Sequence, residues 1–190
     1  VISIKDNICF KGHKVSASSK ILEGFESLYS ATVVERLLEE DAIIIGRLNC
    51  DEFAMGSSNE NLAYGAVKNP VNPNKVPGGS SGGSAAAISS GLVNYAIGTD
   101  TMGSVRIPAS YCGITSFKPS SILNNNNFIK KLSNTYDTIG YMGKEMININ
   151  NLVQCINQKI KVKKIDTNFL KNKKMAKILY LYEVSIKEIK

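Results

Sequence analysis

Two glycine-flanked serines, separated by a stretch of small and apolar residues, place the strongest constraint on how this chain can fold. The first is Ser80, in the run Val76-Pro-Gly-Gly-Ser-Ser-Gly-Gly-Ser84, and the second is Ser104, in the run Gly98-Thr-Asp-Thr-Met-Gly-Ser104. Glycine lets a backbone bend sharply and approach a ligand closely, so both serines are predicted to lie in tight turns. This layout is typical of a serine active site.

Apolar patterns around these runs predict alternating helices and strands, and hence an α/β fold. We expect strands at residues 1–4, 42–46 and 92–97, and helices at residues 32–40, 84–90 and 147–156. The last of these strands would deliver the chain to the loop that holds Ser104. That loop would then follow a strand's carboxyl end, where open α/β sheets place their sites.

Charge divides the chain into two unequal parts. Residues 1–158 carry 13 Lys and Arg against 13 Asp and Glu, whereas residues 159–190 carry 10 Lys against 3 acids, so the net charge of +7 lies in the second part. Its lysines alternate with apolar residues and lack an aromatic stacking pattern, which favours a solvated face over a nucleic-acid contact. The run at 124–127 is predicted to be a low-complexity loop insertion.

Composition argues against several other classes of protein. With 43% hydrophobic content, 190 residues suffice for one core, and no apolar run approaches the roughly 18 residues of a membrane span. Cys9, Cys50, Cys112 and Cys155 are scattered without a CxxC motif or a Cys/His cluster, so neither a metal site nor a disulfide framework is expected. A reducing compartment is the simpler inference.

A serine nucleophile needs a base, and the choice here is narrow. The single histidine, His13, lies among Lys11, Gly12 and Lys14 and is predicted to be in an exposed turn. Lysine is the alternative, because burial or a neighbouring charge can keep its amine neutral. Lys5 stands out because it directly follows an apolar strand, so its stem would leave a core element.

Three separated motifs then resemble the amidase signature family. They are Ile4-Lys5-Asp6-Asn7-Ile8, the glycine-serine run 78–84, and residues 98–108, followed by Cys112-Gly113 and Lys118-Pro119. The motifs occur in the family's order, and Ser80 and Ser104 have its 24-residue separation. Residues 51–61, 64–65, 68–70 and 136–140 are similar to one branch of that family, the A subunits of glutamyl-tRNA(Gln) amidotransferases. The similarity runs from Val1 to about Asn157.

The resemblance implies a fold and a set of site residues. The fold would be a central twisted mixed β-sheet flanked by helices, with residues 1–158 forming part of an amidase signature domain and 159–190 a basic segment without assignment. Lys5 would be the base, Ser80 a proton relay on a cis peptide after Gly79, and Ser104 the nucleophile of an acyl-enzyme. An oxyanion hole would be formed by backbone N–H groups of Thr101, Met102 and Gly103. Supporting positions would be Gly79, Ser81, Asp100 and Arg106.

The same resemblance implies an activity. The chain would hydrolyse glutamine and supply ammonia to B and C partner subunits that convert Glu-tRNA(Gln) to Gln-tRNA(Gln). The chain would hold no cofactor or metal, while the partner would use ATP and Mg²⁺, and no membrane partner is expected. The compartment would be the cytoplasm of a bacterium or the matrix of a mitochondrion or plastid. Two alternatives stay open, namely a free-standing amidase for small amides and a truncated, non-catalytic assembly or binding module.

Some positions and the length of the chain differ from the family pattern or have more than one interpretation. Met102 stands where the family usually has glycine, and a methionine held at a positive φ would add about 1 to 3 kcal/mol of strain. Asp100 and Arg106 bracket the loop, either as a pair that holds its shape or as an ordinary surface ion pair. Asp51 and Glu52 are interpreted as a polar turn with no acid-base role. Family members are also much longer, and their later half recognises the α-carboxylate and α-amine of glutamine.

Overall fold

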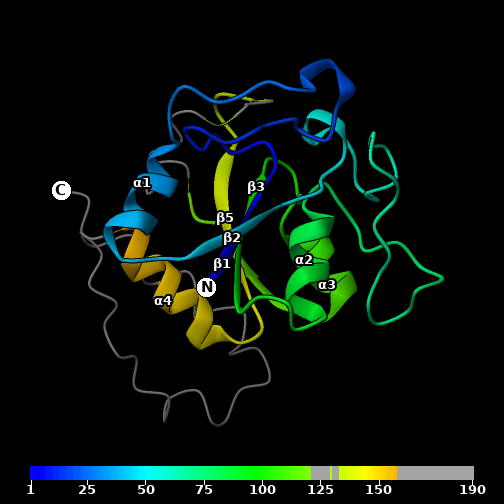
Figure 1. Ribbon diagram of the computed structural model, residues 1–190. Helices are drawn as coiled ribbons and strands as arrows, with labels where there is room; N and C mark the ends of the chain where they lie inside the picture. Colours follow the sequence, from blue (N-terminus) through cyan, green and yellow to red (C-terminus); the bar gives the residue numbers. More distant parts are fainter. Residues whose placement is uncertain (121–128, 130–132, 158–190) are drawn as a thin grey trace, which may run out of the picture.

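The computed structural model describes residues 1–120, 129 and 133–157, so the predicted loop insertion and the basic segment lie outside the described residues. Within this part, five strands form one mixed sheet in the order β2-β1-β3-β5-β4 (Figure 1). The strands are β1 (Ile2–Lys5), β2 (Ile44–Leu48), β3 (Tyr95–Asp100), β4 (Thr115–Phe117) and β5 (Thr138–Gly143). β1 pairs in parallel with β2 and β3, whereas β5 is antiparallel to β3 and β4. The predicted α/β fold with a mixed central sheet is confirmed.

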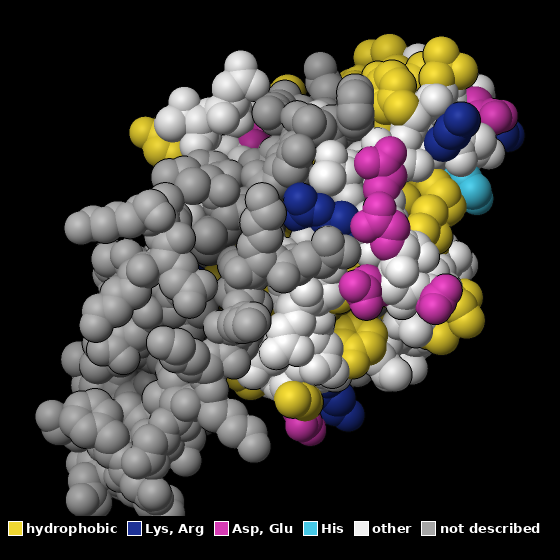
Figure 2. All heavy atoms as spheres, turned by 90° about the vertical axis from the view of Figure 1, so that its left-hand side faces the viewer, with side chains coloured by type: hydrophobic (Ala, Val, Ile, Leu, Met, Phe, Trp, Pro, Cys, Tyr) yellow, Lys and Arg dark blue, Asp and Glu magenta, His cyan; other side chains and the backbone are white. Residues whose placement is uncertain are grey.

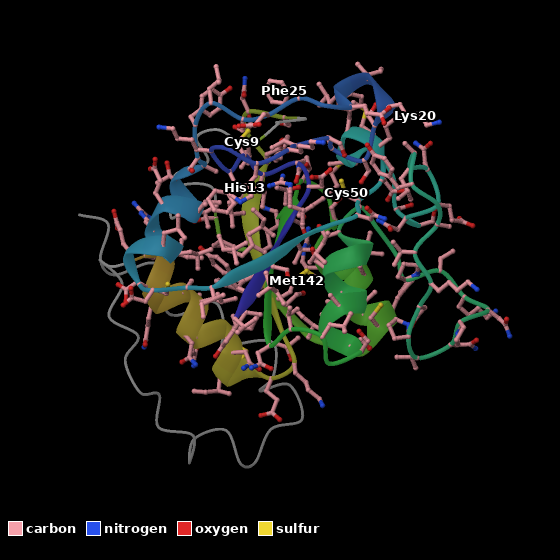
Figure 3. All side chains as sticks on the ribbon, in the orientation of Figure 1. Cys9, His13, Lys20, Phe25, Cys50 and Met142 are labelled. Carbon is pink, nitrogen blue, oxygen red and sulfur yellow. The ribbon has the colours of Figure 1, made fainter. Side chains whose placement is uncertain are left out.

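Helices cover both faces of this sheet. On one side, α1 (Thr32–Glu39) and α4 (Met146–Ile156) enclose a core with β-strand residues such as Ile4, Ile97 and Tyr141 (Figure 1). On the other, α2 (Gly82–Ser89) and α3 (Arg106–Cys112) pack on Ala96 and Met142, and Figure 3 labels Met142 between the sheet and these helices. Two short 3-10 turns, η1 (Lys20–Leu22) and η2 (Glu52–Ala54), lie in the connections. Among the described helices none has the length and apolar character that would let it cross a bilayer.

The apolar spacing of α4 explains why it lies on the sheet. Its buried residues Ile149, Leu152, Val153 and Ile156 recur at intervals of three and four, which places them on one helical face. The helix predicted at 147–156 is thus confirmed to within one residue. The helix predicted at 32–40 is confirmed to the same extent by α1.

Two predicted strands start too early, for the same physical reason. β3 begins at Tyr95 instead of residue 92, because Gly91, with a φ of +77°, and Leu92 form the turn that closes α2. β2 begins at Ile44 instead of residue 42, because the Ala42 N–H still bonds to Leu37 at the end of α1. In the sequence, apolar residues of a helix-closing turn resemble the start of a strand, although their backbone N–H groups donate to carbonyl groups of the helix.

The parallel strands end together at one edge of the sheet. β1 finishes at Lys5, β2 leads to Asp51, and β3 finishes at Asp100, directly before the loop of Ser104. The connection from β1 to β2 runs through α1 on one face of the sheet, and the connection from β2 to β3 runs through α2 on the other face. The strands β2 and β3 therefore lie on opposite sides of β1. Doubly wound sheets bind their ligands at such a point, outside the carboxyl ends of the strands. The fold therefore favours a ligand site at the residues that follow β1 and β3.

A pair of facing glycines seats the Ser104 loop against the sheet. Gly98 in β3 and Gly140 in β5 are register partners, and the fully buried side chain of Val105 packs over both. A Cβ atom built on Gly98 or Gly140 would lie 2.8 or 2.7 Å from Val105 Cγ2, closer than real contacts allow. The absence of side chains at both positions thus lets Val105, the residue after Ser104, approach the backbone of the sheet.

This packing predicts that Gly140→Ala lowers the free energy of unfolding by about 1 to 3 kcal/mol, because the new methyl group overlaps Val105. The loss should be smaller when the same change is made in a Val105→Ala background, where space is available. Denaturant unfolding measures both. Gly46→Ala is the control, since its Cβ would lie 3.9 Å from the nearest atom, Ser3 Oγ. Equal losses at positions 46 and 140 would contradict this account.

Candidate active site

The amine of Lys5 is fully buried and holds residues from two distant parts of the chain. Its Nζ donates to Ser80 Oγ at 2.7 Å, to Thr99 Oγ1 at 3.0 Å and to the Thr99 carbonyl oxygen at 3.5 Å. A protonated amine has three N–H donors, and each has an acceptor here. Asn7 Nδ2 also donates to Thr99 Oγ1 at 3.0 Å, so the polar residues around Lys5 form a connected network.

Burial makes this amine easier to deprotonate than an ordinary lysine. The loss of hydration lowers the pKa of Lys5 from 10.5 to about 8. The negative forms of Cys50, Asp51, Asp100 and Asp137 partly oppose this shift, because they favour the charged amine. Burial in turn raises the pKa of the Cys50 thiol. A neutral Lys5 therefore becomes accessible close to neutral pH, as a general base requires.

Ser80 follows a cis peptide bond and lies two residues before the start of α2. The cis bond joins Gly79 to Ser80, and the Ser80 carbonyl oxygen accepts hydrogen bonds from the Asp51 N–H and from Asn59 Nδ2, both at 3.2 Å. Gly79 packs so closely on Asp51 that a Cβ atom would lie 2.0 Å from its Oδ2. The glycine before Ser80 is thus required by a close approach to the carboxylate beneath it.

Asp51 begins the polar turn predicted after β2, but its side chain makes contacts that the prediction did not include. Its side chain is fully buried, and its two oxygens accept the backbone N–H groups of Asn59 at 3.1 Å and Asn61 at 3.4 Å. Burial raises the pKa of this carboxyl group, while those hydrogen bonds and Lys5 act in the opposite direction. Asp51 contacts the backbone around Ser80. Its place after β2 predicts this contact only when the parallel pairing of the strands is known.

Ser104 is brought next to this cluster through backbone contacts. The Ser81 N–H donates to the Ser104 carbonyl oxygen at 2.9 Å, and Ser81 Oγ donates to the Thr99 carbonyl oxygen at 3.3 Å. Ser104 is half-buried, and its hydroxyl makes no hydrogen bond to the residues that the structure describes. The structure thus joins Lys5 and Ser80 directly, and it ties Ser104 to the residue that follows Ser80.

Asp100 organises the loop between β3 and α3. Its buried carboxylate accepts the backbone N–H of Gly103 at 2.8 Å and of Val105 at 3.0 Å, and it forms a two-point ion pair with Arg106 at 3.0 and 3.1 Å. Burial alone would raise the pKa of Asp100, but the hydrogen bonds from Arg106, Val105 and Gly103 outweigh it and hold the pKa below its ordinary value. The Asp100–Arg106 pair was expected either to hold the shape of the loop or to be an ordinary surface ion pair. The contacts of Asp100 with the loop backbone favour the first.

Two details of the loop differ from the expectations. Met102 is 86% exposed and is not among the residues with positive φ, so its side chain requires no left-handed backbone. The positive φ of this loop, +134°, falls on Gly103 instead. The Gly103 N–H, expected in an oxyanion hole, is already donated to Asp100, whereas no described residue accepts the N–H of Met102 or Ser104.

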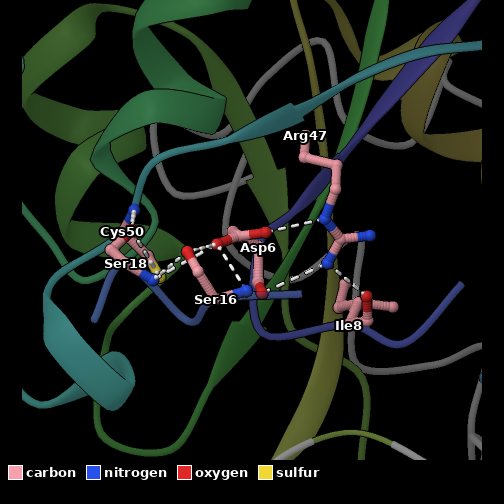
Figure 4. Close-up of polar contacts among 6 residues, drawn as sticks. All are labelled: Asp6, Ile8, Ser16, Ser18, Arg47 and Cys50. Atoms are coloured by element: carbon pink, nitrogen blue, oxygen red, sulfur yellow. Dashed lines mark hydrogen bonds and ion pairs between the residues drawn. The ribbon is translucent and has the colours of Figure 1, made fainter. Parts of the chain in front are cut away.

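An ion pair fixes the chain as it leaves Lys5. Asp6 accepts Arg47 Nε at 2.6 Å on one oxygen and the N–H groups of Ser16 and Ser18 on the other (Figure 4). Arg47 also donates to the carbonyl oxygens of Asp6 and Ile8, at 3.1 and 2.6 Å. Arg47 projects from β2, so this pair locks β1 to its neighbour one residue beyond the buried amine.

The remaining candidate groups lie apart from this cluster. His13 is exposed, as the cyan side chain in Figure 2 shows, and stacks on Phe10 with ring centroids 3.9 Å apart. Its Nδ1 lies 3.0 Å from the Lys11 carbonyl oxygen, in the turn predicted for it. Across the described ranges, no three His, Cys, Asp or Glu side chains are grouped in a way that could hold a metal ion. All four cysteines are free thiols.

Known proteins share the sequence and the fold of this chain. The sequence model of the Amidase family matches residues 1–181. This chain belongs to the amidase family. The family match extends beyond residue 158, so the boundary between an amidase domain at 1–158 and a separate segment at 159–190 stays a prediction.

Several relatives within the amidase family share one name, the A subunit of glutamyl-tRNA(Gln) amidotransferase. The chain is 52% identical over 143 residues to that protein from Chlorobium phaeobacteroides, an alignment that covers 75% of this chain and 30% of the relative. It is 60% identical over 119 residues to the Bacillus velezensis protein, covering 63% and 24%. The crystal structure of the Thermotoga maritima protein superimposes with a TM-score of 0.79 at 43% identity, covering 81% of this chain and 34% of that one. The chain therefore spans 24 to 34% of the length of these relatives.

The shifted pKa of Lys5 predicts a pH-dependent contribution to stability. Between pH 8 and 10.5 the unfolded chain holds this proton more tightly than the folded one, so the contribution of Lys5 to the free energy of unfolding rises with pH. The free energy of wild type minus that of Lys5→Met should increase by about 3 kcal/mol from pH 7 towards pH 10.5. Denaturant titrations at several pH values measure it, with the exposed Lys20→Met as the matched control. A difference that does not change with pH would contradict the prediction.

Proposed function

We propose that this chain is a glutamine-hydrolysing amidase subunit that supplies ammonia for the conversion of Glu-tRNA(Gln) to Gln-tRNA(Gln). The observation that carries the proposal is the buried contact of 2.7 Å between Lys5 Nζ and Ser80 Oγ, beside the loop of Ser104. Support for the substrate comes from the relatives named as A subunits of glutamyl-tRNA(Gln) amidotransferase. Because those relatives are longer, activity, substrate and partners are all part of the proposal.

In the proposed reaction, Ser104 Oγ attacks the side-chain amide carbon of glutamine. Ser80 accepts the proton of Ser104 while the neutral Lys5 amine accepts the proton of Ser80. The same relay returns a proton to the amide nitrogen as the carbon–nitrogen bond breaks, so ammonia leaves and a glutamyl ester of Ser104 remains. Water then cleaves that ester, which releases glutamate and restores the serine. The close contact between Lys5 and Ser80 allows a proton to pass between them, and the lowered pKa of Lys5 makes both its neutral and its protonated form accessible.

The oxygen of the tetrahedral intermediate would be stabilised by backbone N–H groups of the loop. Met102 and Ser104 are the better candidates together with Thr101, because the Gly103 N–H is bonded to Asp100. Loss of one such donor typically costs about 100- to 1,000-fold in rate. The loop conformation is therefore as important to the proposal as the relay itself.

The proposed partners are the B and C subunits of the amidotransferase. The partner would bind Glu-tRNA(Gln) and use ATP and Mg²⁺ to activate its glutamyl group, and ammonia from this chain would replace the activated oxygen. We propose a bacterial cytoplasm or an organelle matrix as the compartment. A free-standing amidase would share the same relay but would need no partner, and a non-catalytic assembly module would need no relay.

The proposal predicts that Ser104→Ala lowers ammonia release from glutamine at least about 1,000-fold in the chain assembled with its partner subunits, since the nucleophile is removed. Ser110→Ala, an exposed serine on the neighbouring helix α3, is the matched control and should retain wild-type release. Ammonia can be followed with a coupled dehydrogenase assay.

Unchanged release in Ser104→Ala would overturn the proposal. Turnover of small amides by the chain alone, without stimulation by the partner subunits, would favour the free-standing amidase. A wild-type assembly that binds the partner subunits but releases no ammonia would favour the assembly module.

A further inference from the structure

A second buried carboxylate holds the loop of Ser104 at its other end. Asp137 is 4% exposed and accepts the hydroxyl of Thr101 on Oδ1 and the N–H of Ser133, at 3.0 Å, on Oδ2. The sheet register explains the first contact. Asp100 pairs with Thr138 at the end of the β3–β5 ladder, so the next residues on each side, Thr101 and Asp137, face each other just beyond it.

Asp137 therefore complements Asp100. Asp100 binds the backbone of the loop's second half through Gly103 and Val105, whereas Asp137 binds its first residue through the Thr101 side chain. The residue between these anchors is the exposed Met102. A loop fixed only by Asp100 would be free to turn at Thr101, and such a turn would redirect the N–H of Met102.

We propose that Asp137 is a positioning residue that holds Thr101, and so keeps the backbone from Thr101 to Ser104 in the one conformation that presents its N–H groups to the reacting oxygen. The assignment rests on the proposed function for what the loop does, but not for how the loop is held. Asp137 acts on the loop through the hydroxyl of Thr101, while its bond to the Ser133 N–H fixes the carboxylate itself.

The charge of Asp137 has a separate effect. Together with Cys50, Asp51 and Asp100, it is one of the groups whose negative charge favours the protonated Lys5 amine. Asp137→Asn keeps an acceptor for the Thr101 hydroxyl but removes this charge. Asp137→Ala removes both, and Thr101→Val removes only the hydrogen bond. The three variants therefore separate the positioning of the loop from the effect on Lys5.

The test uses the full chain and two measurements. Hydrogen–deuterium exchange of peptides spanning residues 99–105 reports the loop whether or not the chain is active. The rate of Ser104 modification by a fluorophosphonate probe, followed by intact mass at several pH values, reports the reactive site. Thr115→Val is the matched control, because its hydroxyl donates to the Lys144 carbonyl oxygen away from this loop.

We expect Thr101→Val and Asp137→Ala to speed exchange in the loop about tenfold and to slow labelling about 10- to 100-fold, while Thr115→Val matches wild type. The double variant Thr101→Val with Asp137→Ala should be no slower than the slower single variant, because both remove one interaction. Asp137→Asn should shift the midpoint of the labelling profile to lower pH, whereas Thr101→Val should leave it unchanged.

Wild-type exchange in a folded Thr101→Val chain would overturn the inference, as would a double variant whose labelling loss equals the product of the single losses. Should Asp137→Ala not fold, Thr101→Val and Asp137→Asn still decide the matter. Faster loop exchange in these variants, together with a wild-type Ser104 that the probe does not modify, would support the positioning by Asp137 and would count against the proposed function instead.

Discussion

The complete burial of the Lys5 amine is the constraint on which this site depends. Lys5 ends β1, an interior strand that lies between β2 and β3, and its Nζ contacts Ser80 and Thr99 from segments 75 and 94 residues away. An unpaired ammonium in such a place would be costly, so every acceptor around it must stay in position. The same burial lowers the pKa of Lys5 to about 8, so the constraint that the fold must satisfy is also the property that makes the amine a usable base.

Carboxylates and glycines act together to meet this constraint. Asp51 contacts Gly79 and the backbone of Ser80, Asp100 binds the loop of Ser104, and in each case the adjacent glycine or N–H group allows the close approach. Three acids around one buried lysine would be unfavourable if each were isolated. Here each accepts hydrogen bonds from neighbouring groups, so the acids position the backbone more than they pair with the amine.

The motifs predicted Lys5, Ser80 and Ser104 and the supporting positions within the same runs, but not the supporting residues outside those runs. Lys5, Ser80 and Ser104 lie in glycine-rich or strand-ending runs whose local chemistry is visible in the sequence. Asp51 and Asp137 were not identified, because their contacts are made across the sheet and follow only from its register. Met102 illustrates a further limit, since a sequence cannot tell which residue of a loop takes the positive φ. Strand starts after α1 and α2 were misjudged where apolar residues complete a helix instead of starting a strand.

The most direct test of this account is the pKa of Lys5 itself. Heteronuclear NMR of the chain, labelled with ¹⁵N at lysine Nζ and assigned with Lys5→Met, gives the pKa of this amine by titration. We predict a pKa near 8, well below the 10.5 of an ordinary lysine, with the resonance protected from exchange by burial. A Lys5 amine that titrates near 10.5, or one that exchanges freely with solvent, would contradict the claim that a dry, readily neutral lysine is the base of this site.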